Sequence, residues 1–291
     1  MKQKSLKRFQ RLTIFVAVAA IGLYGAYASR RTPVEPQQGT GLQWALDSAQ
    51  VAGNRIRIAT YNIHRGKGVD DIRDLNRVAQ VVQHVDLVAL NEVAGPAFFG
   101  QVDQAEALGR AIKSGWLFAP NQRRWHRYHF GNALLSRIEI GAWSQEPLVY
   151  DRQQSRSHRN LLKTQIQLGQ QPVTVLATHI DRGAIRSVQL KFVLQLFTAH
   201  TPAILLGDFN TTEDDSILAG YLQDPNNVDA IGAALGGADP QKRVDWIITR
   251  GLSVLEGGMH PVGISDHPFF WVDVTLPVPN LNLGLPLTIT P

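Results

Sequence analysis

Short apolar runs that end next to a polar residue recur along this chain and constrain its fold more than any other feature. Seven of them have the length and the β-branched content of buried strands. They span residues 55–60, 86–90, 132–136, 173–178, 203–206, 244–249 and 269–274. Two stretches between them, 71–85 and 183–200, carry apolar residues at helical spacing. This mixture of strands and helices predicts one layered α/β domain.

The polar residues stand at the ends of the predicted strands. Strands of one sheet bring their ends to a common rim, and the loops at that rim carry functional sites. Any one of these carboxylates could instead cap a helix or close a turn, so the prediction depends on the whole set. The set comprises Asn62, Glu92, His179, Asp208, Asn210, Asp245, Asp266 and His267.

The chemistry of this set indicates a hard metal ion. Carboxylate and amide oxygens are the ligands that Mg²⁺, Mn²⁺ or Ca²⁺ prefer. The chain has no Cys, which excludes thiolate metal sites and a Cys nucleophile. It also lacks the HExxH, GxSxG and Walker phosphate-loop motifs. A hard cation beside a His base fits hydrolysis of a phosphate ester by an activated water molecule.

The N-terminal segment 1–31 resembles a membrane-targeting sequence. Five basic residues precede residue 12, and residues 12–28 carry no charge. This pattern fits either a short signal anchor or a signal peptide cleaved after Ala28. In both cases we expect the rest of the chain to cross the membrane. It would then be anchored facing the periplasm or the extracellular side, or it would be secreted. Residues 32–53 are rich in Pro, Gln and Gly and predict a linker.

The positive charge of the chain is concentrated in that N-terminal segment. Residues 1–31 hold seven of the 29 Lys and Arg residues and none of the 24 Asp and Glu residues. The remaining 22 basic residues are slightly outnumbered by acidic ones, so the body lacks the overall basic balance of proteins that grip long nucleic acids. A local basic patch is compatible with this composition.

The motifs taken in order resemble a known family. The series TYNIH, LNEV, GNALLSR, ATHID, GDFN, RVDWIIT and SDHP is similar to that of the endonuclease/exonuclease/phosphatase superfamily, which has a deoxyribonuclease-I-like fold. The resemblance covers residues 54–276. It implies a four-layer α/β/β/α sandwich of two mixed β-sheets, and a phosphoesterase that depends on Mg²⁺ or Mn²⁺. The family more often has Gln where Asn91 stands here.

The resemblance also implies roles for individual residues. Glu92 is the main metal carboxylate, with Asn62 and Asp266 beside it. His267 is the candidate general base, and Asp245 fixes its tautomer.

The remaining roles concern the phosphate and the attacking water. By the same resemblance Asp208 and Asn210 orient water and hold the phosphate or the metal, while His179 contacts the phosphate or helps the leaving group. Asn132 lies at the floor of the site, where it would bind substrate. Arg182, just past His179, is placed to bind a phosphate or to form a surface salt bridge. The sequence leaves open whether Asp208 or His267 is the base.

Three functions are compatible with these sequence features. The first is a metal-dependent phosphodiesterase or phosphatase for lipid headgroups or small phosphorylated molecules. The second is a secreted or membrane-tethered nuclease acting on DNA or RNA. The third, of another class, is an inactive binding module, which is disfavoured because all the residues that the chemistry requires are present. We expect a phosphate-ester substrate, contact with a membrane through an uncleaved N-terminus, and no protein partner. The apolar tail 277–291 has strand periodicity and no assigned role.

Overall fold

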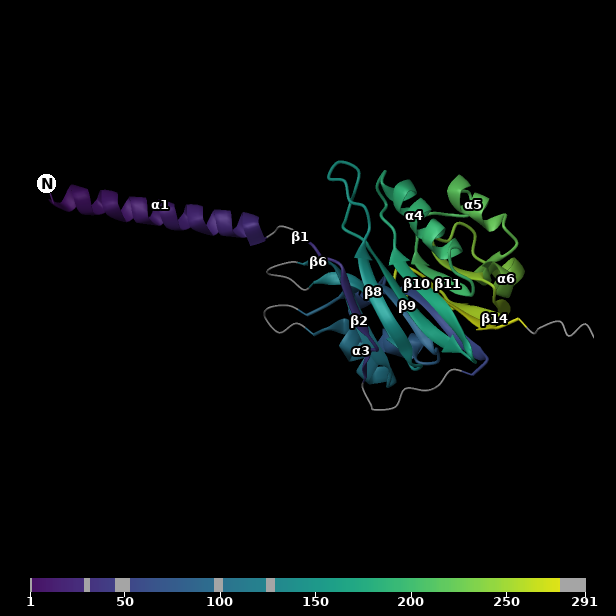
Figure 1. Ribbon diagram of the computed structural model, residues 1–291. Helices are drawn as coiled ribbons and strands as arrows, with labels where there is room; N and C mark the ends of the chain where they lie inside the picture. Colours follow the sequence, from purple (N-terminus) through teal and green to yellow (C-terminus); the bar gives the residue numbers. More distant parts are fainter. Residues whose placement is uncertain (1, 29–31, 45–52, 97–101, 124–128, 278–291) are drawn as a thin grey trace, which may run out of the picture.

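The computed structural model describes residues 2–28, 32–44, 53–96, 102–123 and 129–277, and its body is a sandwich of two β-sheets (Figure 1). The first sheet contains, in spatial order, β1 (Thr32–Pro33), β6 (Gly115–Arg123), β7 (Phe130–Ser136), β5 (Leu87–Ala94), β4 (Arg55–Asn62), β15 (Phe269–Thr275) and β14 (Ser253–His260), and β3 (Gln43–Trp44) pairs with β6. The second contains β12 (Asn227–Asp229), β13 (Asp245–Arg250), β11 (Ala203–Asp208), β10 (Gln171–His179), β9 (Asn160–Leu168), β8 (Ile140–Pro147) and β2 (Gln37–Thr40).

Both sheets are mixed. The β4–β5 pair in the first sheet and the β10–β11 pair in the second are parallel, while the other pairs in the described ranges are antiparallel. Parallel strands end at the same edge, so β4 and β5, and likewise β10 and β11, deliver their last residues side by side. This arrangement confirms the predicted α/β sandwich and explains how distant motifs converge.

Helices cover the outer face of each sheet. They are α2 (Leu75–Val82) and α3 (Gln104–Ile112) on the first sheet, and α4 (Arg186–Thr198) and α5 (Ser216–Leu222) on the second. Helix α6 (Ala230–Leu235) instead packs against the central core, near β13 and β14. Each of α2, α3, α5 and α6 begins where an Asp side chain accepts hydrogen bonds from backbone N–H groups of the first turn. The predicted helices at 71–85 and 183–200 are therefore real but shorter than expected.

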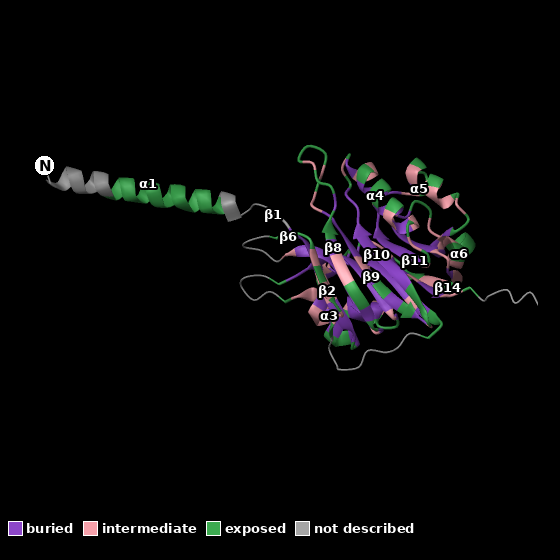
Figure 2. Ribbon diagram, viewed as in Figure 1, coloured by how far each residue is buried: buried purple, intermediate pink, exposed green. Residues whose placement is uncertain are grey.

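Three apolar cores hold the four layers together. The central core joins the facing sheets, for example through Ile58 and Leu134 on one side and Val175 and Ile204 on the other. The two outer cores lie between each sheet and its helices. Figure 2 shows the buried strands in the middle and the exposed surfaces of the helices outside them. This burial on both faces is why the strands read as nearly continuous apolar runs in the sequence.

The N-terminal region adds two features to this body. Helix α1 (Lys2–Ala28) projects away from the sandwich in Figure 1. Among the described residues, no helix combines the length and the hydropathy needed to cross a bilayer. Part of the region expected to be a linker carries the short strands β1, β2 and β3, which pair with β6 and β8. Residues 45–52 of that region, and the tail from residue 278 onward, lie outside the described residues.

Gly207 gives a test of the register between β10 and β11. Its φ is +139°, and a Cβ there would lie 1.8 Å from the carbonyl oxygen of Thr178 on the neighbouring strand. We expect Gly207→Ala to lower the free energy of unfolding by more than about 1 kcal/mol, because both the backbone conformation and the space exclude a side chain. The measurement is urea unfolding followed by circular dichroism.

Gly220 supplies the matched control. It lies inside α5, and a Cβ there would have no heavy atom within 4 Å. Gly220→Ala should therefore raise the free energy of unfolding by about 0.5–1 kcal/mol. A Gly207→Ala protein as stable as the wild type would contradict the close β10–β11 approach.

Candidate active site

The predicted site residues gather at one end of the sandwich. Strand register places Asn62 of β4 beside Asn91 of β5. In the other sheet His179, Asp208 and Asp245 stand side by side on β10, β11 and β13. The turn with Asp266 and His267 is joined to the same edge, because the Ser265 hydroxyl donates to the Asn62 carbonyl oxygen at 2.6 Å. The sheet edges thus bring together residues that are up to about two hundred positions apart in the sequence.

His267 and Asp245 form the central pair of the site. The Nδ1 atom of His267 lies 2.7 Å from Oδ2 of Asp245, and its Nε2 lies 3.8 Å from Oδ2 of Asp208. Burial alone would lower the pKa of His267, but the hydrogen bond and the charge of Asp245, together with Asp208 and Asp266, raise it to about 9. The orienting role of Asp245 requires this hydrogen bond, and the role itself stays a prediction.

Asp208 is buried among polar groups that hold it in one position. Its carboxylate accepts hydrogen bonds from the Asn62 amide at 3.0 Å and from the Asn210 backbone N–H at 2.8 Å. Burial and the nearby Asp245 carboxylate raise the pKa of Asp208 to about 7. This pKa is close to neutral pH, where a carboxyl group can both release and take up a proton during catalysis.

His179 lies on the other side of Asp208. Its Nε2 is 3.2 Å from Oδ2 of Asp208 and 3.1 Å from Nδ2 of Asn210. Burial, reinforced by the positive charge of Arg159, holds the pKa of His179 well below its ordinary range. The lowered pKa of His179 favours its neutral form, whereas the raised pKa of His267 favours its charged form, although both face the same carboxylate. The N–H of a neutral imidazole here can donate one hydrogen bond to a phosphate oxygen.

Three of these groups are close enough to share a metal ion. Asp208, Asp245 and His267 each offer a ligand atom within 4.8 Å of the others. Oδ1 of Asp245 is buried and has no hydrogen-bond partner in the described part of the chain, so one donor atom is free. Carboxylates with one imidazole suit a hard divalent cation. The residues present therefore fit the metal that the sequence led us to expect.

The three residues expected as metal ligands occupy different positions. The Asn62 amide bonds to Asp208, inside the cluster. Asp266 is exposed, and its carboxylate lies 3.3 Å from Nδ1 of His64. Glu92 is half-buried, and its negative charge acts on the Arg159 guanidinium. Their roles as ligands remain predictions, and Glu92 and Asp266 flank the three residues that the geometry groups.

Several site residues have strained backbones. The φ angle is +58° at Glu92, +49° at Asn210 and +45° at His64, in the left-handed region that non-glycine residues seldom adopt. Glu92 coincides with a register shift between β5 and β7. Such conformations persist when surrounding structure imposes them, and they cluster at functional sites. The strained backbone at Glu92, Asn210 and His64 fits a functional role of these side chains rather than a stabilising one.

Asn132 lies beneath the site and links its parts. Its Nδ2 donates to Asn160 at 2.8 Å, and its Oδ1 accepts from Asn91 at 2.9 Å. Asn91 also accepts from the backbone N–H of Asp208 at 2.9 Å. The Asn132 amide is thus occupied by neighbouring amides. These bonds place Asn132 at the floor of the site, and its role in binding substrate stays a prediction.

Arg159 is a site residue that the sequence motifs did not reveal. It is only 4% exposed, and its Nε and Nη1 atoms have no hydrogen-bond partner in the described residues. Burial lowers the pKa of its guanidinium, against the pull of the carboxylates of Asp208, Asp181 and Glu92. A buried cation with free donors beside the site can bind a phosphate. The signal that could have found it was its place immediately before the β9 run, at a strand end like the others.

Arg182 occupies a different place. It lies at the surface, just beyond His179, and it forms no ion pair within the described part of the chain. The neighbouring Asp181 is buried and accepts from the backbone N–H groups of Arg156 and Ser157 at 3.0 and 2.8 Å. This carboxylate ties the loop before β9 to the rim of the site.

The raised pKa of His267 gives a direct test. In the metal-free protein, an NMR titration of the imidazole should show a midpoint near 9, and Asp245→Asn should bring it below that value by removing the partner charge. The folded pKa lies above the ordinary 6.5, so this proton contributes stability that is present below pH 6.5 and is lost as pH rises through about 9. His200, whose pKa burial lowers, is the internal control and should not move. An unchanged His267 midpoint in Asp245→Asn would refute the pair.

Comparisons with known proteins agree with this geometry. The model of the endonuclease/exonuclease/phosphatase family matches residues 59–267. No curated protein matches the chain significantly. A solved endonuclease/exonuclease/phosphatase protein from Beutenbergia cavernae is 22% identical, with a TM-score of 0.61, over 77% of this chain and 72% of that one.

Two further solved structures share the fold at lower identity. The D. rerio TDP2 complex with a single-stranded DNA product is 17% identical, with a TM-score of 0.54, over 76% of this chain and 99% of that one. A mannosyl-6-phosphatase from Bacteroides thetaiotaomicron is 16% identical, with a TM-score of 0.54, over 76% of this chain and 100% of that one. This chain belongs to the endonuclease/exonuclease/phosphatase family, whose members are metal-dependent phosphoric ester hydrolases.

Proposed function

We propose that this protein is a phosphodiesterase that uses His267 to activate the attacking water. The observation that carries the proposal is the His267–Asp245 hydrogen bond of 2.7 Å, which leaves Nε2 of His267 facing the buried Asp208. In the neutral imidazole, Nδ1–H donates to Asp245, so Nε2 presents its lone pair and can take a proton from water. Asp245 then stabilises the imidazolium that results.

Other residues of this chain would bind and orient the phosphate. Arg159 offers two free donors from a buried position, and Asn210 and neutral His179 flank the same carboxylate. Asp208 would hold the water between the two imidazoles. A bound Mg²⁺ or Mn²⁺ ion would neutralise phosphoryl oxygens and favour the neutral form of His267. Asp208 and Asp245, with Glu92, Asn62 and Asp266 beside them, are the residues that would hold it, which leaves Nε2 of His267 free to take the proton.

The place of action is part of the same proposal. The basic and then apolar N-terminal sequence supports a protein whose catalytic domain works outside the cytoplasm. The slight acidity of the body supports a small or lipid-borne phosphate ester over a long nucleic acid.

A generic diester tests the proposed reaction. The full chain should hydrolyse bis-p-nitrophenyl phosphate with Mg²⁺ or Mn²⁺ and lose that activity in EDTA. His267→Ala should lower kcat by about 10²–10⁴-fold, because the general base is gone. His260→Ala is the matched control: His260 is exposed on β14, and within the described part of the chain its imidazole hydrogen-bonds to the adjacent Pro261 carbonyl. Equal activity in the two variants would refute the role of His267, and absence of turnover of both diester and monoester in a folded sample would refute the reaction.

Arg159 gives a second test, in which stability and activity move in opposite directions. Arg159→Met removes a buried cation that has no hydrogen-bond partner on two of its nitrogens in the described structure, so we expect an unchanged or higher Tm. We also expect kcat/KM for the diester to fall by about 10²-fold, because a charge-assisted contact to the phosphate is lost. Calorimetry and steady-state kinetics measure the two effects. A variant that loses stability and retains activity would assign Arg159 to the fold instead.

A further inference from the structure

The apolar N-terminal helix joins the body at the end of the sandwich that carries the site. Thr32 pairs with Arg123, and Arg123 is the last residue of β6. The end of β6 lies at the site because Ala119 pairs with Asn132. Ala28, where α1 ends, is four residues before Thr32, a reach of at most about 14 Å. The helix therefore begins within about 14 Å of β1, at the end of the sandwich that carries the site.

Side-chain contacts place that attachment next to the loop that borders the site. The Gln122 amide, one residue before the end of β6, donates to the Ser157 hydroxyl. The backbone N–H of Ser157 donates to Asp181, two residues after His179. One strand pair and two hydrogen bonds therefore connect the attachment point of the helix with Asp181, which lies next to the catalytic residues.

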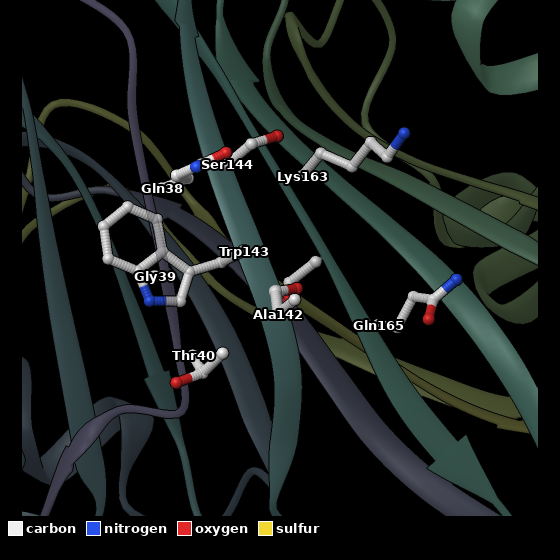
Figure 3. Close-up of a pocket in the computed structure, with 9 residues that line it drawn as sticks. Gln38, Gly39, Thr40, Ala142, Trp143, Ser144, Lys163 and Gln165 are labelled. Carbon is white, nitrogen blue, oxygen red and sulfur yellow. The ribbon is translucent and has the colours of Figure 1, made fainter.

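The chain beyond the helix is fastened to the body. Val34 is buried, and strand β2 pairs with β8. The Trp143 ring lies against Gly39, as Figure 3 shows, and a Cβ at Gly39 would come within 2.7 Å of that ring. The Trp143 indole N–H also donates to the Gly41 carbonyl oxygen at 3.1 Å. These contacts fix where the helix leaves the domain, so the offset between helix and site is set by the fold.

The rim of the site has a composition suited to a membrane surface. Val149 and Tyr150 are 53% and 43% exposed, and they adjoin the exposed Arg152 and Arg156. With Arg182 these residues form what we call the rim patch. None of its three arginines forms an ion pair in the described ranges. Exposed apolar and aromatic side chains beside unpaired cations are typical of contacts with anionic lipid surfaces.

Helix α1 carries a second apolar surface. Seven large apolar side chains from Leu12 to Leu23 are more than half exposed, with Phe15 at 71% and Leu23 at 74%. Between residues 12 and 23 they are distributed around the helix and leave no charged face, which indicates an apolar surrounding rather than water. The basic residues that precede them in the sequence, from Lys2 to Arg11, complement anionic lipid headgroups.

We propose that the rim patch rests on the membrane that α1 enters, and that the substrate is the phosphodiester headgroup of a membrane phospholipid. This inference rests on the proposed phosphodiesterase function and adds its substrate class. The helix attachment and the rim patch are independent features, yet both lie at the site end of the sandwich. A lipid headgroup would reach the catalytic residues without leaving the bilayer surface. The proposal requires α1 to enter the apolar layer, and it holds whether or not the helix crosses it.

Site-directed labelling tests the orientation of the site. The chain has no Cys, so Gln153→Cys and Gln170→Cys each introduce a single labelling site. Both residues are exposed; Gln153 adjoins the rim patch, while Gln170 lies in the β9–β10 turn at the opposite end. The full chain is reconstituted with vesicles of equal parts phosphatidylcholine, phosphatidylethanolamine and phosphatidylglycerol that contain a spin-labelled headgroup quencher.

The expected result is fluorescence quenching at position 153 and none at position 170. Equal quenching at the two positions, or quenching at neither in vesicle-bound protein, would overturn the proposed orientation.

Hydrolysis of the vesicle lipids tests the substrate class. We expect loss of intact phospholipid, measured by mass spectrometry, and a decrease of about tenfold in the double variant Arg152→Gln with Arg156→Gln. The same variant should turn over bis-p-nitrophenyl phosphate at the wild-type rate. Lys113→Gln with Lys163→Gln is the matched control, because it removes the same charge away from the rim patch. It should leave both activities unchanged.

Three outcomes would overturn the substrate assignment. One is turnover of the soluble diester without loss of any of the three phospholipids. Another is faster cleavage of a single-stranded DNA oligonucleotide than of vesicle lipid, which would favour a nuclease. The third is an equal decrease in lipid hydrolysis in both double variants. Absence of turnover of the soluble diester would instead count against the proposed phosphodiesterase function. The experiment therefore distinguishes failure of that function from failure of the phospholipid assignment.

Discussion

A chain of buried asparagine amides holds the two sheets together at the site, and the catalytic geometry depends on it. Asn91 donates to Asn132 at 2.9 Å, Asn132 donates to Asn160 at 2.8 Å, and Asn160 donates to the Ala119 carbonyl oxygen at 3.0 Å. Asn91 and Asn132 belong to the first sheet, and Asn160 belongs to the second. Apolar contacts between the sheets are not directional, so they alone would allow one sheet to shift over the other. Hydrogen bonds with fixed geometry prevent that shift.

The amide chain also reaches the catalytic carboxylate directly. Asn91 accepts from the backbone N–H of Asp208, so the strand that carries Asp208 is positioned from the opposite sheet. Asp208 in turn fixes Asn62 and stands between the two imidazoles. Asn91, at the position where the family more often has Gln, therefore links the two sheets. A side chain one methylene shorter still reaches both partners here.

The site concentrates groups that lower the stability of the protein. Arg159 is buried with unpaired nitrogens, and burial raises the pKa of both Asp208 and Asp245. The backbone is strained at Glu92 and Asn210. A fold selected only for stability would avoid these features, whereas a phosphate and a divalent cation would satisfy the free donors and acceptors.

Much of the fold could be predicted from the sequence, because the central strands are buried on both faces. The predicted runs correspond to β4, β5, β7, β10, β11, β13 and β15. The strands that were missed include β8 and β14, whose exposed residues break the apolar pattern. The site residues were found because motif order indicated strand ends. Arg159 was missed because its local sequence, apart from its place before a strand, does not distinguish a buried arginine from a surface one, and only the fold shows that its side chain is buried.

The pairing of the N-terminal strands has a consequence for solubility. Strands β1 and β3 lie along β6, and β2 lies along β8, so these short segments cover strands that would otherwise be the open edges of both sheets. An uncovered edge offers unpaired backbone groups to any other chain and promotes aggregation. In the described structure the paired strands therefore begin at Thr32, before β4. A molecule in which residues 32–44 are not yet paired would expose the backbone edges of β6 and β8. Pairing of this segment would therefore protect the folded protein from aggregation at high concentration.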